Sequence, residues 1–359
     1  MSAMGEKIQT VPFPRPENPR FRFTDFFAGV GGFRLALQEL GGECVFSCEI
    51  DPHARRTYAA NFGEVPFDDI RRLDPADVPA HDVLTGGFPC QAFSIAGRRG
   101  GFDDARGTLF FELARVIEAV RPRSLLLENV KGLLHHDRGR TLRTIVGVLW
   151  HELGYFVVLP RVLNAKHFGL PQNRERLFIV AFADAAAAGR FAWPETEAVV
   201  RAFGQIKEPG PVSVKYFLSQ RYWETLKAHR ARHQSKGNGF GYEIVADEGV
   251  ANAVVVGGMG RERNLVCDLA HVGLVNDAGV RRMTPREWAR LQGFPDRFVI
   301  PVADTHAYKQ FGNAVPVPVV RAVARQMLFA LDISTVRQTG FFDSGFEGET
   351  LPQRPAQTR

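Results

Sequence analysis

Apolar runs of strand length alternate with helical patterns between Phe21 and about Ala185, and this alternation restricts the fold more than any other feature of the chain. Such alternation is typical of an α/β fold with a mostly parallel sheet. Strands are expected in FRFTDFF, CVFSCEID, HDVLTGG, RSLLLENV, YFVVLPRVL and RERLFIVAFA. A helix is expected in FRLALQEL, which stops at Gly41 and Gly42, where glycine suits a left-handed cap. Another is expected in TLFFELARVIEAV, because its apolar residues repeat at helical spacing: Leu109, Phe110, Leu113, Val116, Ile117 and Val120.

The pattern weakens after Ala185 and returns near the end of the chain. Residues 187–300 hold more Gly and Pro, whereas KQFGNAVPVPVVRAVARQMLFAL is again strongly helical. We therefore expect a first domain built from residues 21–186 and 301–332, and a smaller, irregular domain at 187–300. The polar segments 1–20 and 333–359 are expected to be flexible.

Composition excludes several classes of protein. No run of 18 or more uncharged apolar residues is present, and the N-terminus lacks the apolar core of a signal peptide, so a cytoplasmic protein with no membrane partner is expected. The four cysteines form no CxxC pair and no histidines join them at zinc spacing, which predicts neither a metal site nor a disulfide framework. A net charge of +6 and a pI near 9.3 permit a polyanionic partner.

Glycines separate the first expected strand from the first expected helix. In DFFAGVGGF they are Gly29, Gly31 and Gly32, and a turn of this kind brings backbone N–H groups close to a ligand. Glu49 ends the second strand about twenty residues later, where an acid typically binds ribose hydroxyls, and Asp69 is expected at the next strand end. Either acid could be an ordinary loop residue. Together, in this order, they favour an adenosine-containing cofactor, and the lack of a Gly-Lys-Ser/Thr element argues against ATP.

A cysteine stands behind a proline in GGFPCQAFS. An isolated Cys beside aromatic residues is most often a small buried apolar side chain. Cys90 needs support from elsewhere in the chain before it can be interpreted as a nucleophile.

Five motifs supply that support. DFFAGVGGFRLAL, GGFPCQAFSIAG, ENV, QNRERLFIV and QFGNAVPVPV occur in the order, and at roughly the separations, of the motifs of bacterial cytosine-C5 DNA methyltransferases. The resemblance runs from about Phe21 to Leu331. It implies a Rossmann-like S-adenosylmethionine methyltransferase domain with a smaller target-recognition domain, and a monomer that acts on double-stranded DNA. A cognate restriction endonuclease, acting separately, is a further implied partner.

The resemblance also assigns the catalytic residues. Cys90 would add to carbon 6 of cytosine and so activate carbon 5, which is otherwise a poor nucleophile. Glu128 in ENV would stabilise the ring nitrogen at position 3, and Asn129 would orient the catalytic loop. Arg176 would hold the pyrimidine carbonyl oxygen, and Arg174 points the same way two residues earlier in a strand. An arginine pair with this spacing is otherwise a solvated strand face, and Glu128 could be an acid satisfied by backbone groups.

The cofactor and the catalytic-loop contacts follow from the same resemblance. Phe27 would pack on the adenine, Glu49 bind the ribose, and Asp69 meet the adenine amino group. The full set expected to contact S-adenosylmethionine is Phe27, Gly29, Gly31, Gly32, Glu49, Ile50, Asp69, Ile70, Pro89, Leu109, Asn313 and Val315. On the catalytic loop, Gln91, Ser94 and Arg106 would touch DNA, and the target base would be flipped out of its stack.

Target recognition is expected in residues 187–300. The basic stretch SQRYWETLKAHRARHQSKG would neutralise phosphates through Lys227, Arg230 and Arg232, with Tyr222, Trp223 and Leu226 anchoring one side of a helix. Base readout would come from GNGFGYE and from GGMGRERNL, whose Arg261, Glu262 and Arg263 could address guanine or cytosine edges. These segments resemble those of enzymes that methylate GC-rich sites containing CC. The stretch could instead be a solvated helix face, and either loop a glycine-rich hairpin.

Three other functions remain open at this point. A tRNA cytosine-C5 methyltransferase shares these motifs, although the long region after Ala185 resembles the DNA enzymes. A non-catalytic DNA-binding regulator would be expected to lack the catalytic residues, and all of them are present. A thiol hydrolase could pair Cys90 with His135, His136 or His167, but the glycine turn and the two acids would then serve no purpose.

Overall fold

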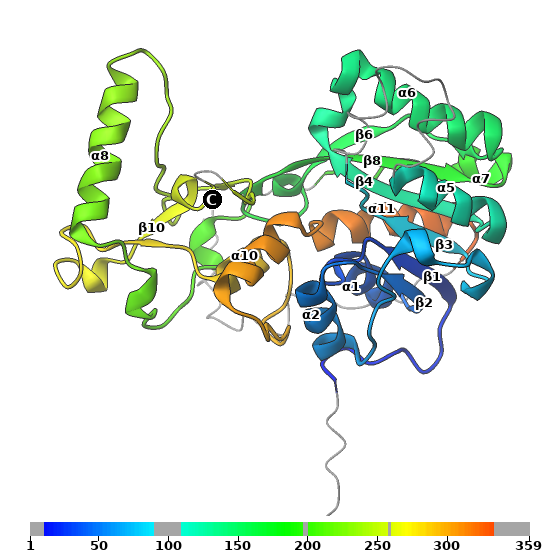
Figure 1. Cartoon of the computed structure of the whole chain (residues 1–359), viewed down its shortest axis with the longest axis horizontal. Coiled ribbons are helices and arrows are strands. Elements are labelled where there is room, and N and C mark those ends of the chain that lie inside the picture. Colours follow the sequence, from blue (N-terminus) through cyan, green and yellow to red (C-terminus); the bar gives the residue numbers. More distant parts are fainter. Residues whose placement is uncertain (1–10, 90–108, 197–199, 258–259, 334–359) are drawn as a thin grey trace, which may run out of the picture.

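The computed structural model describes residues 11–89, 109–196, 200–257 and 260–333. Its centre is a seven-stranded sheet ordered β2, β1, β3, β4, β8, β5, with β6 also pairing with β8 (Figure 1). The strands are β1 (Phe21–Phe26), β2 (Gly42–Cys48), β3 (Val83–Gly86), β4 (Ser124–Val130), β5 (Phe156–Val157), β6 (Arg161–Asn164) and β8 (Glu175–Phe182). The expected α/β fold is confirmed.

Only one strand of this sheet runs against the others. β1 pairs in parallel with β2 and β3, and β3 with β4, whereas β8 is antiparallel to β4, β5 and β6. The single strand expected in YFVVLPRVL is divided into two short strands, β5 and β6. Pro160 lies between them, and proline has no N–H to give to a ladder.

Helices cover both faces of the sheet. One core cluster joins the sheet to α1 (Gly32–Glu39), α2 (Pro52–Phe62), α10 (Asp304–Asn313) and α11 (Val317–Ala330). The other joins it to α5 (Leu109–Val120) and α6 (Arg140–Gly147), and α5 buries Phe110, Leu113, Val116 and Ile117 as its periodicity predicts. α7 (Ala185–Arg190) follows β8. The late helical pattern is broken at Pro316, so α10 and α11 are separate helices.

The expectation of a flexible N-terminal segment is wrong for residues 11–20. Phe13 is 5% exposed, and its ring lies 5.8 Å from that of Phe62 and 6.0 Å from that of Phe298. Arg15 is ion-paired with Glu43 and Glu64. Apolar burial therefore holds this segment against α2. Residues 1–10 and 334–359, also expected to be flexible, lie outside the described residues.

A second group of elements lies on the opposite side of the molecule from β3 and α5 (Figure 1). It contains α8 (Gln220–Gln234), β9 (Ala251–Asn252), β10 (Leu265–Cys267), β11 (Val280–Arg282) and α9 (Pro285–Leu291). β10 and β11 pair antiparallel, and β9 pairs in parallel with β7 (Gln172–Asn173). α8 is anchored as expected, because Trp223 and Leu226 are buried in a small core with Leu218, Leu265 and Val280.

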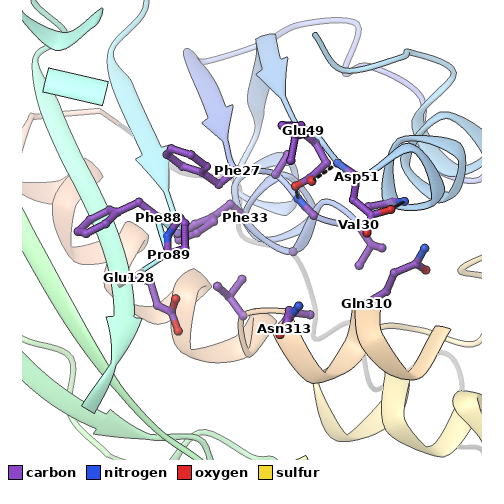
Figure 2. Close-up of a pocket in the computed structure, with 18 of the residues that line it drawn as sticks. Phe27, Val30, Phe33, Glu49, Asp51, Phe88, Pro89, Glu128, Gln310 and Asn313 are labelled. Carbon is purple, nitrogen blue, oxygen red and sulfur yellow. Dashed lines mark hydrogen bonds between the residues drawn. The ribbon is translucent and has the colours of Figure 1, made fainter. Parts of the chain in front are cut away.

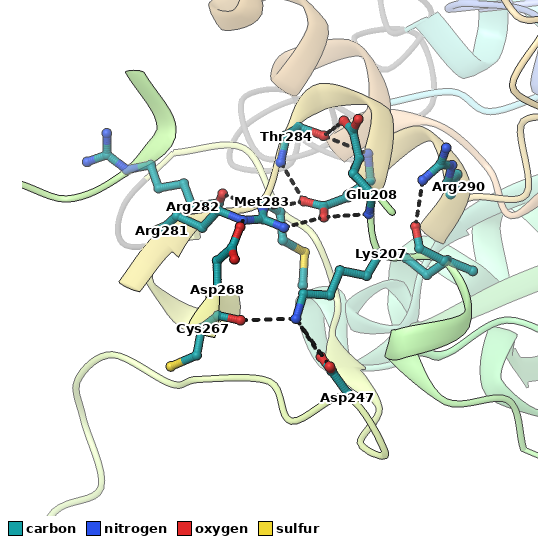
Figure 3. Close-up of polar contacts among 12 residues, drawn as sticks. Lys207, Glu208, Asp247, Cys267, Asp268, Arg281, Arg282, Met283, Thr284 and Arg290 are labelled. Carbon is teal, nitrogen blue, oxygen red and sulfur yellow. Dashed lines mark hydrogen bonds and ion pairs between the residues drawn. The ribbon is translucent and has the colours of Figure 1, made fainter. Parts of the chain in front are cut away.

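A buried carboxylate joins α9 to two other segments, β11 and the residues around Glu208 that precede α8. Both oxygens of Glu287 accept hydrogen bonds from Arg281, at 2.8 Å each, and Glu287 also accepts from the backbone N–H groups of Glu208 and Thr284. The Thr284 hydroxyl in turn contacts Glu208 (Figure 3). Because a buried ion pair is costly to break, this network fixes α9 relative to both segments.

We expect the stability of the fold to fall as pH rises, through Asp25 on β1. Asp25 is fully buried, and burial raises its pKa to about 8 although Arg34 and Thr85 favour the charged form. Between about pH 4 and pH 8 the folded state therefore holds one proton more than the unfolded state. The free energy of unfolding should fall by about 1.4 kcal/mol per pH unit across this window. Asp25→Asn, a neutral isostere, should remove that slope.

The measurement is the denaturant midpoint of wild type and Asp25→Asn at pH 6 and at pH 8. Asp74→Asn serves as the control, because Asp74 is an exposed acid that caps a short 3-10 helix. Equal pH dependence in wild type and Asp25→Asn would show that Asp25 does not titrate in this range.

Candidate active site

A cavity of about 570 Å³ lies at the carboxyl ends of β1, β2 and β4, a volume typical of small-molecule sites (Figure 2). The last residues of α10 close its opposite side. Most residues expected to contact the cofactor line it: Phe27, Gly29, Gly32, Glu49, Ile50, Asp69, Ile70, Pro89, Leu109, Asn313 and Val315. So do four residues expected to be catalytic: Glu128, Asn129, Arg174 and Arg176.

The glycine turn shapes one end of the cavity. Gly29 and Gly31 have φ of 55° and 87°, in the left-handed region that favours glycine, and Gly31 is the N-cap of α1. Gly31, also expected to contact the cofactor, is not among the lining residues: its open side faces Phe62, where a Cβ would lie 2.3 Å from Cε2. A Cβ on Gly32 would lie 2.7 Å from Cγ2 of Val315. The turn can therefore approach the end of α10 only because it lacks side chains.

Glu49 is held rigidly beside this turn. One carboxylate oxygen accepts from the Gly29 N–H at 2.7 Å and the other from the Asp51 N–H at 2.7 Å. Burial raises the pKa of Glu49, while these two N–H groups favour its charged form. Each carboxylate oxygen keeps further acceptor capacity, which suits a pair of ligand hydroxyls.

Asp69 lies on the cavity wall but does not end a strand as expected. The chain before it makes only an isolated bridge, between Phe67 and Cys48, and Asp69 caps the short 3-10 helix Ile70–Arg72. Its carboxylate accepts from the Arg71 guanidinium at 2.7 Å, which lowers the pKa of Asp69. The carboxylate is therefore an acceptor, the form needed to bind an amino group.

Glu128 and Arg176 form an ion pair at the deep end of the cavity. Arg176 Nε lies 3.0 Å from Glu128 Oε1, and both side chains are largely buried because β4 and β8 pair across them. Burial raises the pKa of Glu128, although Arg176 and Arg174 oppose the shift. A carboxyl group in this environment can hold a proton and donate it in a hydrogen bond.

Arg174 makes different contacts from Arg176, because it binds backbone carbonyls. It is 1% exposed, and its guanidinium donates to the backbone carbonyls of Val254, Gly312 and Ala314 at 2.7, 2.9 and 2.8 Å. Its Nε has no acceptor among the described residues. Arg174 thus binds segments that lie far apart in the sequence, although it also reaches the cavity wall.

Asn129 ties β4 to the segment that precedes Cys90. Its side-chain amide donates to the Phe88 carbonyl at 2.8 Å, and Phe88 and Pro89 line the cavity (Figure 2). The next residue is Cys90. Cys90, Gln91, Ser94 and Arg106 lie outside the described residues.

Among the lining residues that the sequence reasoning missed, Asp51, Lys309 and Gln310 carry polar side chains. Lys309 Nζ contacts Asp51 Oδ2 at 2.6 Å and so links α10 to the N-cap of α2. The available signal was helical spacing, because Lys309 and Gln310 lie one turn before Asn313 on α10.

The apolar and polar lining suits a nucleoside with a charged side chain. Phe27, Ile50, Ile70 and Leu109 offer apolar surface, and Glu49 and Asp69 offer carboxylate acceptors. Phe27 has φ of 55°, which is uncommon for a residue other than glycine and places it where β1 meets the glycine turn. In the described part of the chain no group of three or more His, Cys, Asp or Glu residues is arranged to hold a metal ion.

The basic residues expected to bind DNA lie on α8 and near β10. Lys227 contacts Glu224 and Asp277, Arg230 lies over the Tyr242 ring, and Arg232 is exposed. Arg261 and Arg263 are exposed, and Arg261 lies over the Tyr308 ring. The expectation that Glu262 addresses a base is wrong, because it is 6% exposed and accepts hydrogen bonds from Arg282 and Tyr222. None of the described helices has the length and apolar character needed to cross a membrane.

Comparison with known proteins identifies the family. The sequence profile of the C-5 cytosine-specific DNA methylases matches residues 21–328. The chain is 55% identical to the Type II methyltransferase M.HpaII of Haemophilus parainfluenzae, over 86% of this chain and 89% of the relative. It is 46% identical to M.DsaV of Dactylococcopsis salina, over 89% of each chain.

Solved structures share the fold at low identity. Dnmt2 methyltransferase of S. pombe has a TM-score of 0.67 at 20% identity, over 87% of this chain and 99% of that one. The Entamoeba histolytica methyltransferase EhMeth has a TM-score of 0.68 at 15% identity, over 86% and 98%. The chain therefore belongs to the C-5 cytosine-specific DNA methylases and is an S-adenosylmethionine-dependent DNA cytosine-5-methyltransferase of the restriction-modification type.

Proposed function

We propose that the enzyme methylates carbon 5 of one cytosine in a specific duplex DNA site through transient covalent addition of Cys90 to carbon 6. The observation that carries this proposal is the Glu128–Arg176 pair, 3.0 Å apart in the same cavity as the cofactor-type residues. The target carbon is inaccessible inside a stacked duplex, so the cytosine is flipped into this cavity.

The Cys90 thiolate forms a bond to carbon 6, and the electron pair displaced from the ring accumulates at nitrogen 3. Glu128, whose pKa is raised by burial, transfers a proton to nitrogen 3 at this step, and Arg176 holds the carbonyl oxygen. S-adenosylmethionine, when bound, supplies the methyl group that carbon 5 acquires. Water then takes the proton from carbon 5, the nitrogen 3 proton returns to Glu128, and elimination expels the Cys90 thiolate and restores the aromatic ring.

Glu49 binds the ribose of the cofactor in this proposal, and Asp69 binds the adenine amino group. Phe27, Ile50, Ile70 and Leu109 form apolar walls, and Asn313 and Val315 close the methionine end. Support comes from the lining of the cavity and from the two N–H groups that fix the Glu49 carboxylate. A preorganised acceptor loses little freedom when it binds a hydroxyl.

Replacing Glu49 by glutamine should weaken cofactor binding about tenfold or more. The amide places an N–H₂ group against the Gly29 or Asp51 N–H and removes a charge-assisted acceptor worth about 1.5–3 kcal/mol. Calorimetric titration with S-adenosylhomocysteine measures the effect. Glu43→Gln is the matched control, because Glu43 lies on β2, the strand that Glu49 follows, but outside the cavity. Unchanged affinity in Glu49→Gln would exclude Glu49 as the ribose ligand.

DNA recognition is proposed for residues 187–300, opposite the catalytic part formed by 21–186 and 301–332. Lys227, Arg230 and Arg232 on α8 contact phosphates, and Arg261 and Arg263 read base edges. Gln91, Ser94 and Arg106 contact the DNA from the catalytic loop. We propose a GC-rich site containing CC, because arginine addresses guanine with two hydrogen bonds in the major groove.

The relatives support DNA as the substrate over tRNA, since they are Type II methyltransferases, and the same names disfavour a non-catalytic regulator. We further propose that the enzyme acts as a monomer in the cytoplasm, with a cognate restriction endonuclease acting separately on the same site.

Bisulfite sequencing of DNA from cells expressing the protein tests activity and site together. Protected cytosines should share one short GC-rich sequence containing CC. Protection at a different fixed sequence would refute the proposed site while leaving the reaction intact. Absence of protection in DNA, with labelled methyl transfer to tRNA instead, would refute the substrate.

A further inference from the structure

Two buried side chains hold the backbone of Val254. The Val254 N–H donates to Gln172 Oε1 at 2.9 Å, and the Val254 carbonyl accepts from Arg174 Nη1 at 2.7 Å. Gln172 is fully buried and Arg174 is 1% exposed. Because water cannot replace either partner, a shift of Val254 would leave buried polar groups unsatisfied.

Val254 lies three residues before GGMGRERNL, the segment proposed to read DNA. Val255 and Val256 follow it with exposed side chains, and Arg261 and Arg263 come shortly after. The side chains that fix Val254 therefore fix the start of this segment. The inference below rests on the proposed function in this one respect.

Arg174 also binds the segment that closes the cofactor cavity. Arg174 Nη2 donates to the carbonyls of Gly312 and Ala314, which flank Asn313 at the end of α10. Gly312, Asn313 and Ala314 all line the cavity. A ligand that moves or stiffens this segment must therefore act on the Arg174 guanidinium.

A direct contact and a second side chain reinforce the connection. A Cβ on Gly312 would lie 2.7 Å from Cγ2 of Val256 and 3.3 Å from its backbone nitrogen, so α10 packs tightly against the segment that follows Val254. Gln172 also donates to the Leu291 carbonyl, and the neighbouring Gln292 side chain donates to the Phe311 carbonyl. Buried hydrogen bonds thus run without interruption from Val254 to the end of α10.

We propose that Arg174 is a positioning residue that couples cofactor binding to DNA binding, by holding the recognition segment at Val254 and the cofactor segment at Gly312 and Ala314 with one guanidinium. Ordering of either segment by its own ligand lowers the cost of ordering the other. Linkage requires the effect to be reciprocal, so each ligand raises the affinity for the other by the same factor.

The test measures that factor. Dissociation constants of S-adenosylhomocysteine are measured with and without a duplex carrying the site found by bisulfite sequencing, and those of the duplex with and without S-adenosylhomocysteine. We expect a factor of at least about five in wild type, in both orders. Arg174→Met should reduce it to less than about two, and Arg174→Lys should retain an intermediate value. Tyr155→Phe, which removes one buried hydrogen bond to the Pro122 carbonyl, should keep the wild-type factor.

A purely structural role for Arg174 would lower thermal stability without changing the factor. A folded Arg174→Met protein that keeps the wild-type factor would overturn the proposal. If Arg174→Met does not fold, Gln172→Leu is tested in its place, because it removes the acceptor of the Val254 N–H. We expect this variant to reduce the coupling factor at least by half. An unchanged factor would reject the coupling. Wild-type enzyme that methylates DNA but shows no coupling between the two ligands would also reject the role of Arg174. That outcome would leave the proposed function intact.

Discussion

Alanine in place of Cys90 is expected to abolish methyl transfer and to leave duplex binding measurable. Without the thiolate, carbon 5 of cytosine stays a poor nucleophile and the two-step route through a covalent adduct is lost. We expect turnover to fall by a factor on the order of a thousand or more. The measurement is transfer of a tritiated methyl group to DNA carrying the site, with duplex binding followed in parallel.

Trapping of a covalent adduct gives an independent readout for the same residue. Once S-adenosylmethionine has supplied a methyl group, a 5-fluorocytosine at the target position has no proton on carbon 5 to lose. Wild type with the methyl donor should therefore remain bound to this duplex covalently, and Cys90→Ala should not. Cys267→Ala is the matched control, because Cys267 lies on β10, away from the cavity. Unchanged turnover in Cys90→Ala would exclude the thiol mechanism.

Glutamine in place of Glu128 is expected to lower turnover by about a hundredfold to a thousandfold. The amide keeps the shape of the side chain but cannot transfer a proton to nitrogen 3, and it leaves Arg176 without its ion-pair partner. The 5-fluorocytosine adduct should also form more slowly, because Glu128 acts when the thiolate adds. Loss of methyl transfer with adduct formation at the wild-type rate would contradict this role.

The pH profile separates this role from a structural one. Burial raises the pKa of Glu128, so the protonated form persists to higher pH than in an exposed glutamate and is lost as pH rises through that pKa. The wild-type rate should therefore carry an alkaline limb that Glu128→Gln lacks. Glu118→Gln, on the exposed face of α5, should keep both the rate and the limb.

Local pattern predicted the elements of the sheet, and the resemblance of the ordered motifs predicted much of the cavity wall. Strand and helix periodicity depends on neighbours within one element, and parallel strands necessarily bring their carboxyl ends to one edge. That is why Phe27, Glu49 and Glu128, each at or just beyond a strand end, lie around one cavity. Asp69 reached the same wall without a strand before it, since a single bridge to Cys48 and a cap on a short helix placed it there.

Burial in the folded chain decided the orientation of adjacent residues that the sequence pattern could not distinguish. Arg261, Glu262 and Arg263 are consecutive and all polar, yet only Glu262 is turned into the protein, toward Arg282 and Tyr222. Gly31 and Gly32 are adjacent, yet one faces Phe62 and the other Val315. No local signal distinguishes them, because the neighbour that fills the space comes from a distant segment.

The sequence by itself determined which residues meet at the carboxyl edge of the sheet and what chemistry they carry, because element periodicity and motif order are local properties. Only the tertiary structure separated the two arginines of the QNRER motif. Arg176 pairs with Glu128 across adjacent strands, whereas Arg174 binds carbonyls 80, 138 and 140 positions away. The physical reason is that a buried guanidinium takes whichever acceptors the packed chain brings to it, and packing brings them from segments that no local pattern connects.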